Sequence, residues 1–229
     1  MTSVAIVLLV QASLSFSPLG YLAGPEGRLY PLYGMRSNFL LGEPVDEKVL
    51  SAASFGGKMV QKLPWGIRLP GERTLPTAGG PALFAWTSSS GGMLYAWLPA
   101  TREMISSTTG AVQLPFELDH VTAMAFPDAR RLRILRSKRQ DWEIIDLDIQ
   151  GFRVMRITEV ATTLAALDSL GNVWSGVDAE VACESSRWRL DEPLLAFTPL
   201  DDGWMVLQTR TAAQAARCNV SDLSAVPLP

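Results

Sequence analysis

The chain has 229 residues, of which 48% are hydrophobic and 19% charged, so it holds enough apolar side chains for a sizeable core and is not a disordered protein. Its 20 Lys and Arg against 23 Asp and Glu give a net charge of -3, which offers no electrostatic case for binding nucleic acid, and we expect none. Closed all-β domains of this length commonly fold as one unit, so we expect a single domain over residues 16–229.

The first 15 residues allow two interpretations. The apolar run from Val4 to Val10 has the length of the hydrophobic region of a signal peptide, and small residues at Ala12, Ser13 and Ser15 suit a signal peptidase. No Lys or Arg precedes the run, which weakens the signal-peptide interpretation and leaves a buried N-terminal strand as an equal alternative. The run is too short to cross a bilayer, so we expect no transmembrane span. A cleaved signal would place the protein in the periplasm or outside the cell, and otherwise it would be cytoplasmic.

Residues 19–34, LGYLAGPEGRLYPLYG, predict two short strands joined by a turn at Pro25-Glu26-Gly27. From residue 46 onward the sequence then divides into five modules that recur about every 35 to 40 residues, a spacing typical of repeat architectures. The modules cover residues 46–78, 79–118, 119–158, 159–193 and 194–229.

The third module is the clearest copy. It contains four apolar-rich runs, VTAMAF, LRILRSK, WEIIDLD and FRVMRIT, separated by the turns PDAR, RQD and IQG. Four strands and three tight turns predict one blade of a β-propeller. We therefore expect an all-β, six-bladed β-propeller of four-stranded blades, in which residues 19–34 form an outer hairpin that closes the ring or belongs to the sixth blade. Five or seven blades, or an incomplete ring that dimerises through unpaired edge strands, are the alternatives to a closed monomer.

Two segments also fit a helix. Val160, Leu164 and Leu167 have helical spacing, but the following LDSLGNVW aligns with LDDGW in the next module, so we expect a strand. The second segment, TAAQAAR at residues 211–217, is rich in good helix formers and predicts a helical turn or an insertion.

The segment LDSLGNVWSGVD resembles the Asp-x-x-Gly-Asn-x-Trp element of propellers in the sensor domains of two-component regulators. Asp168, Gly171, Asn172 and Trp174 match that element, and a partial copy occurs at Asp201, Gly203 and Trp204. Residues 19–34 are similar to the strand-turn-strand unit of YVTN, NHL and lactonase-like propellers, a class of repeats that also includes WD40. The resemblance implies a turn that tolerates positive φ and a Trp packed between blades, and it implies nothing about function.

Acidic residues recur at the predicted links between modules, namely Glu43, Asp46, Glu47, Glu117, Asp119, Glu159, Asp191 and Glu192. These links open on the face where loops carry function, so we predict a ligand-binding set there composed of Glu117, Asp119, His120, Glu159 and Asp191. Such carboxylates could line one mouth of the central channel and bind a divalent cation, or they could be ordinary solvated turn residues. His120 is the sole histidine and no nucleophile motif accompanies it, which argues against a catalytic triad.

Basic residues mark the loops predicted between second and third strands, on the same face: Arg73, Arg102, Lys138, Arg139 and Arg210. Opposite charges on one face predict either surface ion pairs or a charged docking surface. Seven tryptophans are spread over the modules, mostly within predicted strands, so we expect them to pack between blades.

Cys183 and Cys218 lie one module apart, which predicts corresponding strands in neighbouring blades. Packed sheets lie about 10 Å apart, beyond the usual reach of a disulfide unless the strands converge, so we expect two buried thiols rather than a bridge.

These observations favour a non-catalytic propeller scaffold that binds a protein partner or a small ligand on its connector-loop face, with no cofactor apart from the open case of a divalent cation. The alternative is a metal-dependent, lactonase-like hydrolase that uses carboxylates at the channel mouth. That alternative requires at least three carboxylates of one set to converge within metal-coordination distance, namely Glu43, Asp46, Glu117, Asp119, Glu159 and Asp191.

Overall fold

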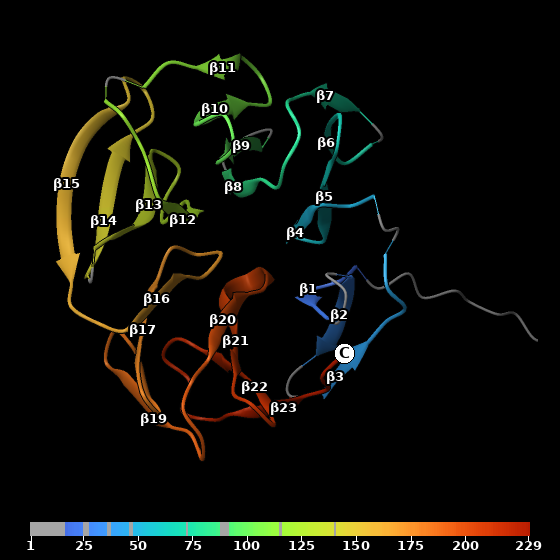
Figure 1. The fold of residues 1–229 in the computed structure, drawn as a ribbon, viewed down its shortest axis with the longest axis vertical. Helices are drawn as coiled ribbons and strands as arrows, with labels where there is room; N and C mark the ends of the chain where they lie inside the picture. The colour runs from blue at the N-terminus through green and yellow to red at the C-terminus, as the bar shows by residue number, and fades with distance from the viewer. Residues whose placement is uncertain are drawn as a thin grey trace, which may run out of the picture.

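The structure is a computed structural model that describes residues 17–24, 28–35, 38–45, 48–71, 73–87, 92–114, 116–139 and 141–229. Six antiparallel sheets surround a central axis, so the protein is a six-bladed β-propeller, as predicted (Figure 1). No helix in these ranges is long and apolar enough to span a bilayer. The predicted signal peptide or strand over residues 1–15 and the predicted turn at residues 25–27 lie outside the described residues.

The blades follow one another along the chain. The first consists of β1 (Gly20–Ala23), β2 (Leu29–Met35) and β3 (Asn38–Leu41). The second consists of β4 (Ser51–Phe55), β5 (Lys58–Leu63), β6 (Gly66–Arg68) and β7 (Thr74–Pro76). The third consists of β8 (Leu83–Thr87), β9 (Met93–Leu98), β10 (Glu103–Ser106) and β11 (Gly110–Val112).

The remaining three blades have four strands each, as the module boundaries predicted. The fourth consists of β12 (Val121–Ala125), β13 (Arg131–Lys138), β14 (Asp141–Asp148) and β15 (Arg153–Val160). The fifth consists of β16 (Leu164–Leu167), β17 (Val173–Val177), β18 (Glu180–Cys183) and β19 (Ser186–Arg189). The sixth consists of β20 (Ala196–Pro199), the 3-10 turn η2 (Asp201–Gly203), β21 (Trp204–Gln208), β22 (Ala213–Arg217) and β23 (Ser224–Val226).

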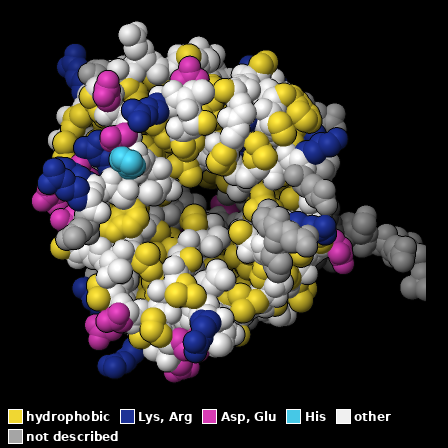
Figure 2. Space-filling view, viewed as in Figure 1, with side chains coloured by type: hydrophobic (Ala, Val, Ile, Leu, Met, Phe, Trp, Pro, Cys, Tyr) yellow, Lys and Arg dark blue, Asp and Glu magenta, His cyan; other side chains and the backbone are white. Residues whose placement is uncertain are grey.

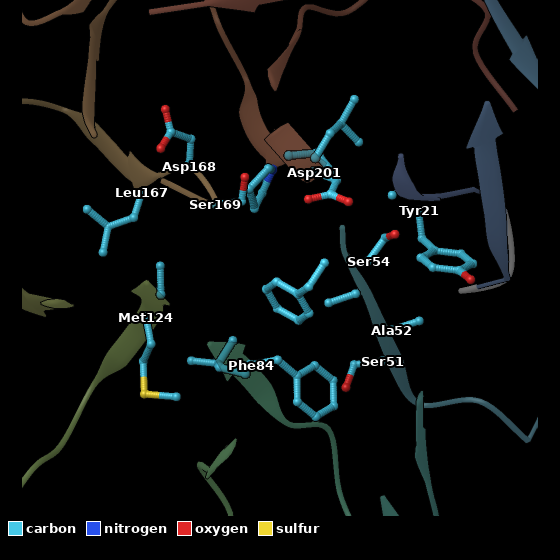
Figure 3. Close-up of a pocket in the computed structure, with 18 of the residues that line it drawn as sticks. Tyr21, Ser51, Ala52, Ser54, Phe84, Met124, Leu167, Asp168, Ser169 and Asp201 are labelled. Carbon is cyan, nitrogen blue, oxygen red and sulfur yellow. The ribbon is translucent and has the colours of Figure 1, made fainter. Parts of the chain in front are cut away.

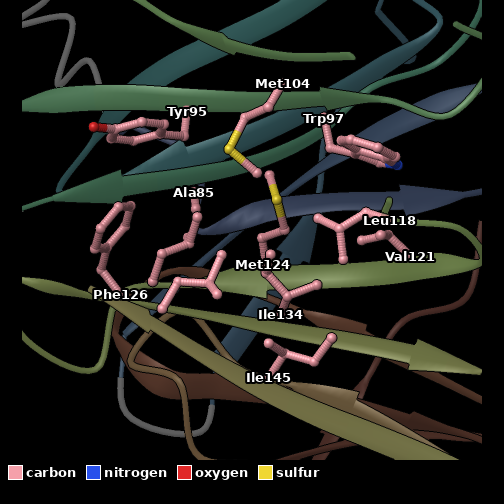
Figure 4. Packing of buried hydrophobic residues seen from close by; sticks show 12 residues of the cluster. Ala85, Tyr95, Trp97, Met104, Leu118, Val121, Met124, Phe126, Ile134 and Ile145 are labelled. Carbon is pink, nitrogen blue, oxygen red and sulfur yellow. The ribbon is translucent and has the colours of Figure 1, made fainter. Parts of the chain in front are cut away.

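Apolar side chains fill the spaces between neighbouring blades. Tyr95 and Met104 of the third blade, for example, pack against Met124 and Ile134 of the fourth (Figure 4). The alternation of β strands explains this arrangement, because successive side chains point to the two faces of a sheet and each face meets another blade. The core is therefore divided into layers between the blades, and the axis of the ring stays open.

Most of the tryptophans pack between blades, as expected. Trp97, Trp174 and Trp188 are buried, and the rings of Trp174 and Trp188 stack at 5.1 Å between centroids. Trp65 is the exception, because it lies in the short loop between β5 and β6 and is 55% exposed.

The prediction for TAAQAAR was wrong, because Ala213–Arg217 form the strand β22. Ala213 and Ala215 are buried with Leu32 and Phe39 of the first blade, in the layer that closes the ring. Small side chains allow the sheets to approach closely there, and this tertiary packing outweighs the helix preference of alanine. The segment 164–167, in contrast, is the predicted strand, β16.

The two faces of the ring carry different loops. We call the face with the links between blades and the loops between second and third strands the connector face, and the face with the first hairpin turn of blades two to six the hairpin face. Figure 2 views the connector face, with the histidine in cyan and an opening at the centre of the ring.

The first blade enters the ring with reversed polarity. Its inner strand β1 begins on the hairpin face, where the Asp201 amide donates to the carbonyl oxygen of Leu19 at 2.5 Å. Ser17, which precedes β1, lies against Gly57 in the hairpin turn of the second blade: a Cβ atom placed on Gly57 would be 3.1 Å from Ser17 Oγ. Both contacts put the start of β1 on the hairpin face. β1 therefore runs antiparallel to the other five inner strands. The predicted hairpin supplies the inner pair of this three-stranded sheet, not an outer hairpin.

Cys183 and Cys218 form a disulfide, with Cα atoms 5.5 Å apart, so the prediction of two thiols was wrong. Cys183 is the last residue of β18 and Cys218 directly follows β22, so both lie at the same end of the third strands of the fifth and sixth blades, the corresponding strands that their spacing predicted. At this end the two strands converge, which brings the Cα atoms within disulfide reach even though packed sheets stand about 10 Å apart on average.

Candidate functional site

The predicted ligand-binding residues all lie on or near the connector face and are exposed: Glu117, Asp119, His120, Glu159 and Asp191. Two of them join one network on the fourth blade. Asp119 Oδ1 lies 3.5 Å from Arg136 Nη1, and Glu159 Oε1 lies 4.0 Å from Lys138 Nζ. Both cations also bind the buried carboxylate of Glu143.

Glu143 is the centre of this network and is only 3% exposed. Arg136 donates to its Oε2 from Nε at 2.8 Å and from Nη2 at 2.6 Å, and Lys138 donates to its Oε1. Hydrogen bonds from Lys138 and Arg136 lower the pKa of Glu143 although burial opposes them. The charges of the fourth blade therefore compensate one another, which favours the ion-pair interpretation of this face.

The other predicted residues do not join that network. Glu117 lies beside Trp97 and Arg102 in a separate groove of about 260 Å³, and Asp191 lies in the link between the fifth and sixth blades. His120 has a φ of 50°, so it forms part of the turn that enters β12. Arg73, predicted for this face, lies between β6 and β7 and so belongs to the hairpin face.

No group of three or more His, Cys, Asp and Glu in the described ranges is arranged to hold a metal ion. The metal-dependent hydrolase requires at least three converging carboxylates, and the described residues do not provide them. Asp46 and Glu47 lie outside the described residues.

A cavity of about 250 Å³ runs along the axis of the ring. It is lined by the inner strands of all six blades, mostly with apolar or hydroxyl-bearing residues such as Ala52, Phe84, Thr122, Met124 and Leu167 (Figure 3). None of the five predicted connector residues lines it. Each link leads from the outer strand of one blade to the inner strand of the next, and the predicted carboxylates lie along this path without lining the cavity.

Two carboxylates line the cavity instead, and Asp168 is engaged in the structure of its own turn. Its Oδ1 accepts from the amides of Leu170 and Asn172, and its Oδ2 accepts from Asn172 Nδ2 at 2.9 Å and Trp174 Nε1 at 3.0 Å. Gly171 adopts a φ of 80° in the same turn. Burial raises the pKa of Asp168 although these hydrogen bonds oppose the shift. The element therefore has the structural role that its resemblance implied.

Asp201 has fewer partners. Its Oδ2 accepts from the Gly57 amide at 3.0 Å and its Oδ1 from the Asp202 amide at 2.9 Å. No ion pair within the described ranges involves it, whereas Asp202 pairs with Arg217 at 3.0 Å. Figure 3 shows its carboxylate directed towards the middle of the ring, while that of Asp168 points away.

An aromatic groove of about 620 Å³ adjoins the cavity on the hairpin face and shares Phe55, Ser169 and Asp201 with it. The rings of Phe55 and Trp86 stack at 6.2 Å between centroids. Lys58 Nζ lies 5.5 Å from the centroid of Trp86, on a ring face that attracts cations. The cavity thus ends in a mixed aromatic and acidic surface.

No protein-family model and no curated protein matches this sequence. Among solved structures, one described as the structure of the Dos1 propeller is similar over 89% of this chain and 72% of that chain, with 11% sequence identity and a TM-score of 0.42. At this level of similarity the comparison identifies no family.

Sequence reasoning missed Asp201 as a site residue, although a signal was present. In the complete copy of the element, six positions separate Asp168 from Trp174, and Asn172 lies between them. The copy at Asp201 is shorter, with Trp204 only three positions after the aspartate. It therefore has no asparagine four positions on and no tryptophan six positions on to donate hydrogen bonds to the carboxylate. A carboxylate that loses its internal donors is the one available to a ligand.

Proposed function

We propose that this protein is a non-catalytic binding module that takes a small ligand into the axial cavity. The propeller fold supports a binding or scaffold role in general. The opening at the centre of the connector face and the cavity of about 250 Å³ behind it support the location (Figure 2). Ligand sites are commonly concave, mostly apolar and supplied with a few placed polar groups, and this cavity has that composition.

The observation that carries the proposal is the position of Asp201. Its carboxylate faces the middle of a largely apolar cavity and has no ion-pair partner among the described residues. Six inner strands hold the walls, so the cavity is preformed and a ligand would not have to order it. The role of Asp119 and His120 in contacting a protein partner stays a prediction, since the charges beside Asp119 are already compensated within the fourth blade.

The test uses a reporter in the wall of the cavity. Met124 lines the cavity and packs between the third and fourth blades, whereas Met205 is fully buried between the fifth and sixth blades. With methionine methyl groups labelled with carbon-13, titration with benzylamine should shift the Met124 methyl resonance saturably and leave that of Met205 unchanged. A titration with benzylamine and benzyl alcohol in which neither probe moves the Met124 resonance would contradict the proposal.

We also propose that the protein functions outside the reducing cytoplasm. The Cys183–Cys218 disulfide supports this, because such bonds persist mainly in secreted and periplasmic proteins. The apolar run at residues 4–10 supplies a candidate export signal. Fractionation of cells that produce the full chain with a C-terminal tag should recover it in the periplasm or medium, and recovery in the cytoplasm alone would contradict this location.

A further inference from the structure

Resting on the proposed function of the axial cavity, we propose that its ligand is a small organic cation, a primary ammonium or an amidinium on a flat apolar body. In this arrangement the charged group binds the Asp201 carboxylate, and the apolar body lies between the inner strands and the aromatic groove at Phe55 and Trp86.

The charge of the site points to a cation. Three carboxylates and one ammonium line the cavity and the adjoining groove: Asp168, Asp201, Asp202 and Lys58. Asp168 is turned away and accepts four hydrogen bonds, and Asp202 is paired with Arg217. Lys58 lies over the Trp86 ring. Asp201 is the carboxylate that remains for a ligand.

The hydrogen bonds of Asp201 leave room for a donor. An ionised carboxylate offers roughly four lone-pair positions, and backbone amides use two of them here. An ammonium or amidinium group brings several N–H donors and makes charge-assisted hydrogen bonds, which are stronger than those of neutral donors. A ligand with such a group would complete the coordination of both oxygens.

The donor set favours an organic cation over a metal ion. Calcium takes roughly six to eight oxygen ligands, and carboxylates usually dominate the set. Asp168 is committed to its own turn, and no three carboxylates of the described residues converge at this point. The rest of the wall is apolar or aromatic, a surface that suits the hydrocarbon part of an organic cation.

The aromatic groove suits the apolar body of the ligand. The rings of Phe55 and Trp86 stack, and Lys58 Nζ lies over Trp86. A flat apolar body would extend this stack while the positive group binds Asp201, away from the Lys58 ammonium.

The experiment compares benzylamine, which is charged at pH 7, with benzyl alcohol, a neutral molecule of similar shape. Dissociation constants come from the Met124 methyl shift in wild type, in Asp201→Asn and in Asp222→Asn. Asp222 is exposed in the loop between β22 and β23 and is remote from the cavity, so its variant makes the same charge change elsewhere. Thermal unfolding of each variant establishes that it is folded.

We expect wild type to bind benzylamine at least about tenfold more tightly than benzyl alcohol, the range for a hydrogen bond to a charged group. Asp201→Asn should lose that preference and keep its affinity for benzyl alcohol, and Asp222→Asn should match wild type. Equal binding of both probes in wild type and Asp201→Asn would overturn the cation while leaving the cavity as a binding site. Equal losses in Asp222→Asn would also overturn it, as a general charge effect. Failure of both probes to move Met124 would overturn the cavity as well.

Discussion

Cys183 and Cys218 join the fifth blade to the sixth at corresponding ends of their third strands, with Cα atoms 5.5 Å apart. Their neighbours strengthen this connection, because the Asn219 amide donates to Ser186 Oγ at 3.2 Å and Trp188 Nε1 donates to the Ser221 carbonyl oxygen at 3.1 Å. The sixth blade, which must also pack against the first to close the ring, is thereby fixed to the fifth.

We expect the disulfide to contribute about 3–4 kcal/mol to the free energy of unfolding, the value for a closed loop of this length in the chain-entropy account. Urea unfolding of the oxidised protein and of the Cys183→Ser, Cys218→Ser double variant measures the difference. Treatment with a reductant should lower the wild-type midpoint to that of the double variant and leave the variant unchanged. Equal midpoints for the oxidised protein and the variant would contradict this contribution.

Glu143→Gln should destabilise the fourth blade, because it removes the charge that Arg136 and Lys138 share. We expect a loss of about 2–3 kcal/mol at pH 7, less than for a fully buried pair because Lys138 is exposed. The pKa of Glu143 is lowered in the folded protein, so its contribution is present above the unfolded pKa and is lost as pH falls through the folded pKa.

Unfolding by urea between pH 7 and pH 3 therefore tests the role of Glu143. The difference between wild type and Glu143→Gln should shrink as the pH falls. Glu180→Gln, at an exposed position of β18, is the control and should change stability by no more than about 0.5 kcal/mol. A difference that stays constant with pH would show that ionisation of Glu143 does not stabilise the fold.

Lys62→Met should stabilise the protein by about 1–3 kcal/mol, because an apolar side chain of similar length replaces a buried ammonium. Lys62 is fully buried, and the Leu63 carbonyl oxygen, at 2.5 Å from its Nζ, is its hydrogen-bond acceptor. Burial lowers the pKa of Lys62 in the folded protein. As the pH rises from the folded pKa towards the unfolded pKa, the wild type should therefore gain stability. The difference in free energy of unfolding between the variant and the wild type should narrow over the same range. Thermal unfolding from pH 7 to pH 10 measures this, and a less stable variant would contradict it.

Asp168→Asn should lower the free energy of unfolding by about 1–3 kcal/mol. Each carboxylate oxygen of Asp168 accepts two hydrogen bonds, and asparagine places an NH2 donor at one of these two positions. Urea unfolding followed by tryptophan fluorescence measures the loss. The matched control is Asp178→Asn, because Asp178 is exposed and has a φ of 52°, which asparagine tolerates. Equal stability of the two variants would contradict the structural role of Asp168.

The blades could be predicted from the sequence because their signals are local. Short apolar runs and turn residues define each strand. The module boundaries at 79, 119 and 194 fall in the links between blades, and the boundary at 159 falls at the end of β15, just before the link. The strand at Ala213–Arg217 could not be predicted this way, because its small side chains matter only once the first and sixth blades meet.

The disulfide and the site depend on distances across the ring, which no local pattern contains. Whether Cys183 reaches Cys218 depends on the convergence of two strands from different blades. The connector carboxylates recur with the modules, but none of the five predicted connector residues lines the axial cavity. Asp201 differs from Asp168 by the length of one turn, and only the structure shows that this difference directs its carboxylate into the cavity (Figure 3).

The most direct measurement is a crystal structure of the protein grown with benzylamine. The account predicts electron density for one probe molecule in the axial cavity, with its nitrogen within hydrogen-bond distance of Asp201 and its ring beside the inner strands. Well-ordered crystals with an empty cavity, or with benzylamine bound only at the connector carboxylates Asp119 and Glu159, would contradict it.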